Sequence, residues 1–321
     1  MRQTSKLLVI AGTIAIVAGP AAAADKFVRI VSGPAGGSWY PLGAKIAEVI
    51  EKSVKGVSTK NTPGGGVGNV RDVSRGNAEI GWTYGHTAYD GYAGQGAFKK
   101  KNPNVRHLAT LYPAGLQTVV PAKSKIMSYA DLKAKSISPG KAKWSGYAAY
   151  KMVIGHYGYT IDDVKKGGGT VHHVSYKDSV ALMKDGHIEA FTALTSVPQA
   201  SFLALEFSPG VRFLPIDKPV LDKIMKSNPG YIRMTINQNN YKSVKAPVET
   251  LGAVTILVIN KDVPADRAYA ITKALWENHA QFVAVKKVWN KVKLESALLG
   301  AATPVHPGAM KYYAEKGVKK Q

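Results

Sequence analysis

The sequence predicts an α/β fold in two domains, and three observations lead to this prediction. Residues 26–92 contain three consecutive strand, loop and helix patterns, and a second series of such patterns runs from 136 to 194. The third observation is the length, because 321 residues correspond to about two domains. We therefore expect a mostly parallel sheet flanked by helices in each domain, with functional loops at the carboxyl ends of the strands.

The first unit begins with residues 26–32, KFVRIVS, whose β-branched and aromatic side chains predict a strand. A glycine-rich turn follows at 33–38. Pro41 suits the first turn of a helix, and apolar residues then recur at helical spacing as far as Lys52. These residues predict one β-loop-α unit.

The second unit consists of a short strand at 57–61, a glycine-rich loop at 63–69 and a short helix after it. The third unit consists of a strand at 78–82 and a helix over 87–92. Residues 105–122 are extended and interrupted by Pro-Ala-Gly at 113–115. We expect the chain to cross there into the second domain.

The second domain should repeat the architecture of the first. Its expected elements are a helical turn at 129–132, strand 136–138, helix 147–157, a strand from 171, helix 179–184, strand 188–194, helix 200–206, strand 211–215 and helix 221–228. The apolar run 250–259 predicts a buried strand that returns to the first domain. The tail should be mostly helical from 266 to about 286 and again from 298 onward. The resulting domains are 25–118 plus 250–321 and 119–249.

Composition excludes several kinds of chemistry and leaves the charge to be explained. The chain has no cysteine, which removes thiol catalysis, iron–sulfur clusters and thiolate zinc sites. It has 43 Lys and Arg against 21 Asp and Glu, a formal charge of +22. Such a surplus is compatible with nucleic acid, an anionic membrane surface or an anionic small ligand as partner.

Residues 1–24 predict a cleaved secretory signal peptide. Arg2 and Lys6 precede an apolar stretch at 7–17, and small residues at 19–24 supply the cleavage site. The alternative is a membrane anchor, but the apolar stretch is shorter than the roughly 20 residues that a bilayer span needs. We therefore expect an exported, periplasmic protein.

Removing the expected signal peptide takes away two basic residues and no acidic one, so the charge surplus falls only to 20. The surplus thus belongs to the exported chain. Nucleic acid becomes a minor alternative, because its largest pool lies in the cytoplasm.

No nucleophile elbow, phosphate-binding loop, dinucleotide fingerprint or HExxH motif occurs, and we expect no cofactor. His172 and His173 are adjacent on an expected strand, so their side chains should point to opposite faces and share no metal. The glycine run at 64–68 can present backbone N–H groups to an anion. Because it lacks a Gly-Lys-Ser/Thr ending, it suits a carboxylate better than a nucleotide.

Aromatic and small polar residues gather at the loop ends of both domains, at 38–40, 83–86, 143–145 and 192–195. Each aromatic residue alone fits ordinary packing. Together they lie where open α/β sheets bind ligands. We interpret them as a binding cleft without catalytic machinery.

Several segments resemble the solute-binding subunits of TRAP transporters of the TAXI type. They are 36–43 (GGSWYPLG), 69–70, 76–82 (GNAEIGW), 88–90, 94–98, and 306–309 with Tyr312 and Tyr313. The resemblance covers nearly the whole mature chain. It implies a two-lobed periplasmic binding protein of type II-like fold, in which a cleft between the lobes closes on a small anion for delivery to an ion-driven permease. Dicarboxylates and amino acids are typical ligands of similar proteins.

Three departures from the family pattern change the expected ligand. Tyr84-Gly85-His86 replaces a Gln-Ser-Asp sequence, residues 143–146 (KWSG) replace Gly-Ser-Gly-Thr, and Leu194 replaces a glycine. Losing the acidic position removes a partner for a ligand ammonium group. We therefore expect an organic carboxylate with an apolar or aromatic portion, with Lys143 and His86 as charge partners and the aromatic rings as stacking surfaces.

The expected ligand-binding residues come from both domains. They are Gly37, Ser38, Trp39, Tyr40, Gly66, Asn69, Tyr84, His86, Lys143, Trp144, Ser145, Thr192 and Thr195. Two other functions stay open: a periplasmic enzyme acting on a similar anion with His86 as general base, and a ligand sensor or surface antigen. We expect no metal and a monomer that works with TRAP membrane subunits.

Overall fold

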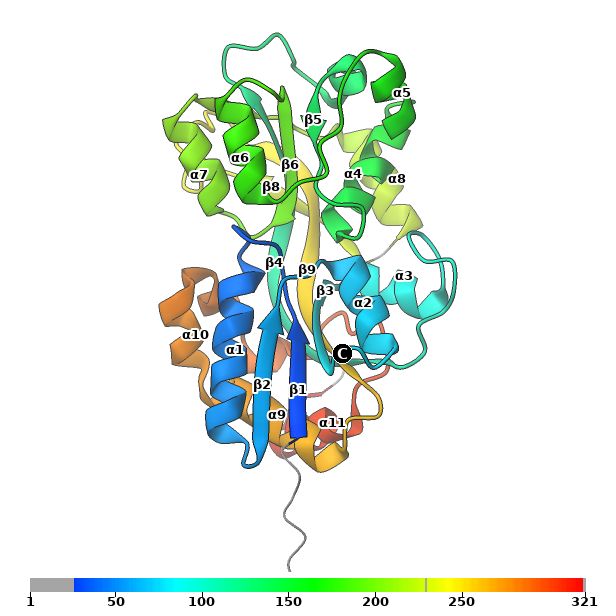
Figure 1. The fold of residues 1–321 in the computed structure, drawn as a ribbon, viewed down its shortest axis with the longest axis vertical. Coiled ribbons are helices and arrows are strands. Elements are labelled where there is room, and N and C mark those ends of the chain that lie inside the picture. The colour runs from blue at the N-terminus through cyan, green and yellow to red at the C-terminus, as the bar shows by residue number, and fades with distance from the viewer. Residues whose placement is uncertain (1–25, 229, 320–321) are drawn as a thin grey trace, which may run out of the picture.

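A computed structural model describes residues 26–228 and 230–319, which form two lobes one above the other (Figure 1). The expected signal peptide at 1–24 lies outside the described residues. Within the described ranges, no helix is both long enough and apolar enough to cross a membrane.

The lower lobe is built from the three predicted β-loop-α units. Its strands are β1 (Lys26–Val31), β2 (Val57–Thr62) and β3 (Ile80–Tyr84), and its helices are α1 (Trp39–Ser53), α2 (Gly66–Ser74) and α3 (Gly85–Ala93). β1 pairs in parallel with both β2 and β3. Parallel strands place all three carboxyl ends, and the helix starts that follow them, at the upper edge of this lobe.

Two long strands run through both lobes (Figure 1). β4 (Val105–Pro121) and β9 (Val248–Asn260) pair antiparallel, and the sheet order is β2-β1-β3-β9-β4-β6-β5. The β4/β9 register shifts between Thr110 and Pro113, at the predicted crossing. The domain boundaries proposed from the sequence fall inside these two strands.

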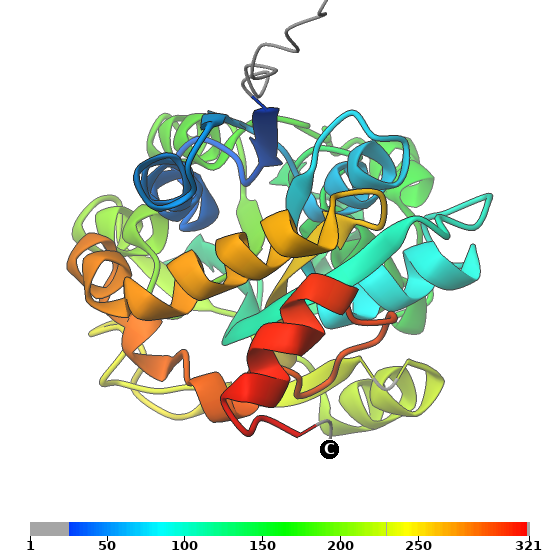
Figure 2. The same cartoon turned by 90° about the horizontal axis from the view of Figure 1, so that it is seen from below.

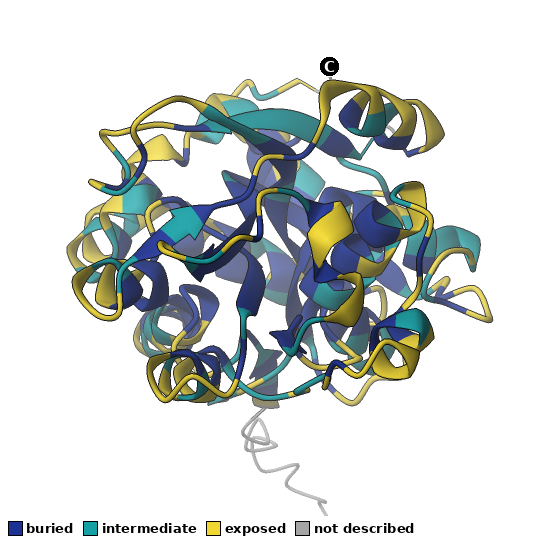
Figure 3. Cartoon of the chain, turned by 90° about the horizontal axis from the view of Figure 1, so that it is seen from above, coloured by how far each residue is buried: buried dark blue, intermediate teal, exposed yellow. Residues whose placement is uncertain are grey.

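The upper lobe contains the elements between β4 and β9. They are η1 (Tyr129–Ala134), β5 (Ile137–Ser138), α4 (Ser145–His156), α5 (Ile161–Lys166), α6 (Tyr176–Lys184), β6 (Ala190–Thr195), α7 (Ala200–Phe207), β7 (Val211–Phe213), α8 (Lys218–Ser227) and β8 (Tyr231–Ile236). Buried residues follow the strands and the inner helix faces, while exposed residues cover the outside (Figure 3).

The C-terminal segment covers the base of the lower lobe (Figure 2). It contains α9 (Ala265–Glu277), α10 (His279–Val285), η2 (Lys287–Lys291), η3 (Leu294–Ser296) and α11 (Pro307–Glu315). The predicted helical tail is thus correct for the first part, and wrong at 298–306, which contains no helix before Pro307.

The structure corrects three details of the sequence prediction. The sheet is mixed, because β4 and β9 pair antiparallel with each other and with β6 and β3 respectively. The expected strand from 171 is only a single bridge between Val171 and Ile137. β8 and α5 had no predicted counterpart.

Candidate functional site

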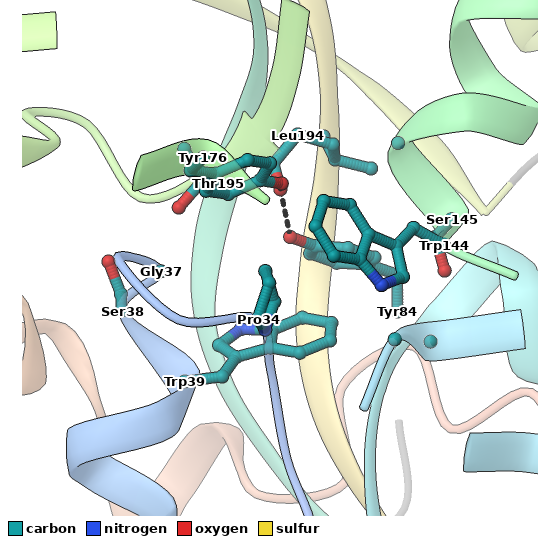
Figure 4. Close-up of a pocket in the computed structure, with 13 residues that line it drawn as sticks. Pro34, Gly37, Ser38, Trp39, Tyr84, Trp144, Ser145, Tyr176, Leu194 and Thr195 are labelled. Atoms are coloured by element: carbon teal, nitrogen blue, oxygen red, sulfur yellow. Dashed lines mark hydrogen bonds between the residues drawn. The ribbon is translucent and has the colours of Figure 1, made fainter. Parts of the chain in front are cut away.

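A cavity lies between the lobes, at the carboxyl ends of β1, β3 and β6 (Figure 4). The space between its lining atoms is about 340 Å³, part of which is open to solvent. It is lined by Pro34, Gly37, Ser38, Trp39, Gly65, Gly66, Tyr84, Trp144, Ser145, Gly146, Tyr176, Leu194 and Thr195. Among the residues that the structure describes, no lysine, arginine, aspartate or glutamate lines it.

Four helices begin at this cavity. Their N-caps are Ser38 for α1, Gly65 for α2, Tyr84 for α3 and Trp144 for α4, and all four line the cavity. None of these helices has a side-chain cap or an acidic residue in its first turn. In the first turn of α2, the Gly68 N–H donates to the Lys143 carbonyl oxygen. The other first-turn N–H groups and the helix dipoles give the cavity a positive potential that suits an anion.

Some other helices of the upper lobe begin with a carboxylate. α5 and α6 each begin with a capping box, in which Asp163 and Asp178 supply the first-turn carboxylates. Asp131 does the same for η1. α7, α8, α10 and α11 also lack an acidic residue in the first turn, so what sets the four cavity helices apart is that they begin at one place.

Aromatic rings from both lobes form the cavity walls (Figure 4). Trp39 and Tyr84 of the lower lobe lie 4.6 Å apart between ring centroids. Trp144 and Tyr176 of the upper lobe meet edge to face at 5.2 Å. Such walls favour an apolar or planar portion in a ligand.

Hydrogen bonds across the cavity hold the lobes closed. The Tyr84 hydroxyl donates to the carbonyl oxygen of Leu194 at 2.7 Å, shown as a dashed line in Figure 4. The hydroxyls of Ser38 and Ser196 lie 2.5 Å apart, and the Thr87 hydroxyl donates to Ser145 Oγ at 2.9 Å. Burial raises the pKa of Tyr84 well above its ordinary value, so its hydroxyl stays protonated and able to donate.

The lobes also approach each other closely at two glycines, Gly65 and Gly66, where α2 begins. A Cβ added at Gly65 would lie 1.8 Å from Trp144 Cδ1, and one added at Gly66 would lie 2.1 Å from Ser145 Oγ. Gly65 has φ −175°, an extended conformation open to any residue. Glycine is therefore required at 65 by the opposite lobe and not by the backbone.

Comparison with known proteins places the chain in a family. A family model described as NMT1-like matches residues 30–317. The chain belongs to the NMT1-like family. Its fold resembles that of a protein from Bordetella bronchiseptica RB50, with 19% identity, 91% of this chain and 80% of that chain covered, and a TM-score of 0.54.

Two weaker structural similarities involve sulfonate-binding proteins. One is the periplasmic aliphatic sulphonate binding protein SsuA from Escherichia coli, with 14% identity and a TM-score of 0.45. The match covers 90% of this chain and 78% of that chain. The alkanesulfonate-binding protein SsuA from Xanthomonas axonopodis pv. citri, bound to MOPS, has 15% identity, 91% and 85% coverage and a TM-score of 0.47. The predicted two-lobed α/β fold of this NMT1-like protein is confirmed.

The structure brings eight of the thirteen expected ligand-binding residues of the NMT1-like protein to the cavity. They are Gly37, Ser38, Trp39, Gly66, Tyr84, Trp144, Ser145 and Thr195. Their role in ligand binding stays a prediction.

Three of the other expected residues, Asn69, Thr192 and Tyr40, do not line the cavity. The Asn69 side chain donates to the carbonyl oxygens of Ser32 and Trp82 at 2.7 Å each, which fixes the loop before α2. Thr192 pairs with the Thr118 hydroxyl at 2.7 Å within the sheet. Tyr40 is exposed on α1 and does not line the cavity.

The expected charge partners, His86 and Lys143, do not line the closed cavity. Lys143 is exposed, and its carbonyl oxygen accepts from the Gly68 N–H of the other lobe at 3.0 Å. His86 is buried between Tyr84 and Tyr231, with its centroid 3.9 Å from the Tyr231 ring. Burial lowers the pKa of His86 to about 3, so the ring is neutral near pH 7 and contributes no charge to an anion site.

The buried His86 predicts a loss of folding stability in mild acid. As the pH falls, the unfolded chain binds a proton near pH 6.5, while the folded chain resists protonation to about pH 3. Stability attributable to this ring is thus present above pH 6.5 and declines below it, by about 2 kcal/mol at pH 5. Urea unfolding measures the free energy of unfolding at pH 7 and at pH 5. The decrease between the two pH values should be about 2 kcal/mol smaller in His86→Phe than in the wild-type protein. An equal decline in both proteins would contradict the assignment.

Five lining residues were absent from the sequence-based set: Pro34, Gly65, Gly146, Tyr176 and Leu194. Gly65 and Gly146 lie in loops that the sequence had marked. Leu194 lies in the loop end marked at 192–195 and was also noted as a departure from the family pattern. Tyr176 carried no signal, because residues 171–176 were expected to form a strand and instead lead into α6.

The structure offers no metal site within residues 26–228 and 230–319, where no group of three His, Asp or Glu side chains could hold an ion. His172 lies 3.0 Å from the Thr170 hydroxyl, and His173 Nδ1 lies 2.8 Å from the Gly140 carbonyl oxygen. His172 thus contacts its own loop, and His173 contacts the loop before α4.

Proposed function

We propose that this chain is an extracytoplasmic solute-binding receptor, which closes its two lobes on a small organic anion and delivers it to a membrane transporter. The observation that carries this proposal is the meeting of four uncapped helix starts at an aromatic-walled cavity between the lobes. A cavity with this arrangement can hold an anion and an adjoining apolar group together.

The anion is bound by backbone N–H groups in this proposal, because no lysine or arginine lines the closed cavity among the described residues. The hydroxyls of Ser38, Ser145 and Thr195 supply further donors. The surplus of 20 positive charges on the exported chain acts at longer range, by attracting anions to the protein surface.

The aromatic rings select for the rest of the ligand. Four rings, those of Trp39, Tyr84, Trp144 and Tyr176, offer faces and edges to a planar or apolar group. A monocarboxylate with an aromatic or branched apolar portion supplies both the anion and this group. An amino acid is disfavoured, because no carboxylate among the described lining residues is available for its ammonium group.

For the transporter class, this proposal relies on the sequence resemblance. The segments 36–43 and 76–82 support a TRAP-type permease as the partner, in the manner of TAXI-type subunits. The expected signal peptide supports delivery from the periplasm.

The alternative of a periplasmic enzyme required His86 as general base, and its position disfavours that role. His86 does not line the cavity, and its pKa of about 3 makes it a poor base near neutral pH. The described residues pair it with no carboxylate, since Nε2 contacts the Thr87 hydroxyl at 2.9 Å and Nδ1 has no hydrogen-bond partner.

Calorimetric titration tests the ligand class. The panel pairs aliphatic and aromatic carboxylates and sulfonates with their uncharged amides, and includes glutamate. We expect at least one aromatic or branched acid to bind, and its amide to bind at least about 30-fold more weakly, since charge-assisted bonds contribute roughly 2 kcal/mol or more. Tight binding of glutamate with inert aromatic acids would overturn the proposed ligand class.

A further inference from the structure

A second hollow lies on the side of the molecule where α7 of the upper lobe stands above α10 of the lower lobe (Figure 1). We call it the α7–η2 groove. The space between its walls is about 920 Å³, part of which is open to solvent. It is lined by Ser196, Val197, Pro198, Ala200, Leu203, Asn240, Lys286, Lys287, Val288 and Lys291. Both lobes contribute, because the residues up to Asn240 belong to the upper lobe and the last four to the lower lobe.

The groove combines an apolar wall with an unpaired basic one. Val197, Pro198 and Leu203 line the upper side. Lys286, Lys287 and Lys291 line the lower side, and none of them forms an ion pair within the described part of the chain.

Apolar surface continues outward from the groove along α7. Leu203 is 43% exposed, and Phe207, one helical turn later, is 94% exposed. Residues four apart share a helix face, so the two side chains extend the apolar wall. Exposed large apolar residues beside a hollow are typical of a protein contact site.

The lysine wall is rigidly held. Trp289 of η2 is buried, and its ring packs 4.7 Å from Phe282 and 6.3 Å from Trp82. The ring centroids of Trp82 and Trp39 lie 5.8 Å apart, and Trp39 lines the ligand cavity. The lysines therefore stand on a segment packed against the wall of the ligand site.

The shape of the groove depends on lobe closure. Ser196 lines the groove, and its hydroxyl pairs with Ser38, which lines the ligand cavity on the other lobe. Opening the lobes would break this contact and separate the apolar wall from the lysine wall. A partner that needs both walls would thus recognise only the closed form.

We infer that the α7–η2 groove is the docking surface for an acidic, amphipathic segment of the membrane partner, and that it is complete only when the lobes are closed. This inference rests on the proposed function. Carboxylates of the segment face the three lysines, and its apolar side chains meet Leu203 and Phe207. A concave site with walls from two lobes fits an inserted protein segment better than a flat lipid surface.

Site-specific photo-cross-linking tests the inference in cells that contain the native transporter. Benzoylphenylalanine replaces Phe207 in the full chain, and mass spectrometry identifies the adduct. We expect the cross-linker at position 207 to form an adduct with a membrane protein of the transporter, at an acidic segment of that protein. Its yield should fall at least about tenfold in Lys287→Glu/Lys291→Glu, because like charges at an interface cost 1.4 kcal/mol or more.

The matched control is Lys99→Glu/Lys100→Glu, which makes the same charge change at exposed lysines outside the groove. This control should keep the adduct, and Gly65→Ala, which hinders closure, should lose it. An adduct that survives reversal of the groove lysines, or is lost equally in the control, would overturn the inference. So would lysine-dependent binding to phosphatidylglycerol vesicles with no protein adduct.

The two proposals fail in different ways. If the ligand panel finds no anion but the lysine-dependent adduct persists, the proposed ligand is wrong and the docking surface stands. If anions bind with unchanged affinity in Lys287→Glu/Lys291→Glu and the adduct also persists in that variant, the proposed ligand stands and the docking surface is wrong.

Discussion

Gly65→Ala is expected to reduce the affinity for the anionic ligand by at least about 100-fold, equivalent to about 2.8 kcal/mol. The added methyl would lie 1.8 Å from Trp144 Cδ1 in the closed form. Trp144 is 5% exposed and wedged between Tyr176 and Gly140, so it cannot move aside easily. Calorimetry should show the loss of affinity, and small-angle scattering should show that ligand no longer compacts the variant.

The fold itself should tolerate this change. Gly65 is the N-cap of α2 and has an extended conformation, so alanine should cost about 1 kcal/mol or less of unfolding free energy. Gly65→Ser, which offers a good cap, should lose affinity equally. Gly155→Ala is the matched control, because a Cβ there meets nothing within 4 Å. Near-normal affinity in Gly65→Ala would mean that the lobes need not close as described.

Trp144→Ala is expected to weaken ligand binding by about 30- to 100-fold, since buried aromatic contacts contribute about 2 to 3 kcal/mol. Trp144 forms a wall of the cavity and supports Tyr176, another wall, through an edge-to-face contact. Trp144→Phe should recover part of the affinity, because it keeps an aromatic surface. Titration of each variant with the acid selected from the panel measures the change.

Trp276→Ala controls for the general cost of removing a tryptophan. Trp276 is buried in α9, donates to the Tyr313 hydroxyl at 3.1 Å and does not line the cavity. It should lower the free energy of unfolding by about 3 to 5 kcal/mol while leaving affinity unchanged. Equal losses of affinity in both variants would show that Trp144 acts through stability alone.

Much of the fold was predictable because local patterns agree with tertiary structure. The strand at 26–32, the helix to Lys52 and the extended stretch at 105–122 correspond closely to β1, α1 and β4. Glycine-rich turns between apolar runs fix such units locally. The antiparallel passage of β9 through both lobes depends on long-range pairing, and its direction could not be obtained from the sequence.

The candidate site was predictable where loops follow strands. Ser38, Tyr84 and Trp144 follow or end predicted elements and reach the cavity. Burial could not be inferred in the same way. His86 looked like an accessible base in its loop, but stacking on Tyr231, far away in the sequence, buries it and keeps it neutral.

The absence of acidic residues at the four cavity-facing helix starts was visible in the sequence, but its meaning was not. Only the structure shows that α1, α2, α3 and α4 begin at one cavity. Their convergence replaces the charged partners that the sequence analysis expected. In the proposed function, the anion is therefore bound by backbone donors in place of Lys143 and His86.

Native mass spectrometry of the purified protein tests the central claim most directly. We predict that the wild-type protein retains a small organic anion, identifiable after release, and that Gly65→Ala retains none. A retained neutral or cationic molecule, or equal retention of the same anion by Gly65→Ala, would contradict the account of an anion enclosed by lobe closure.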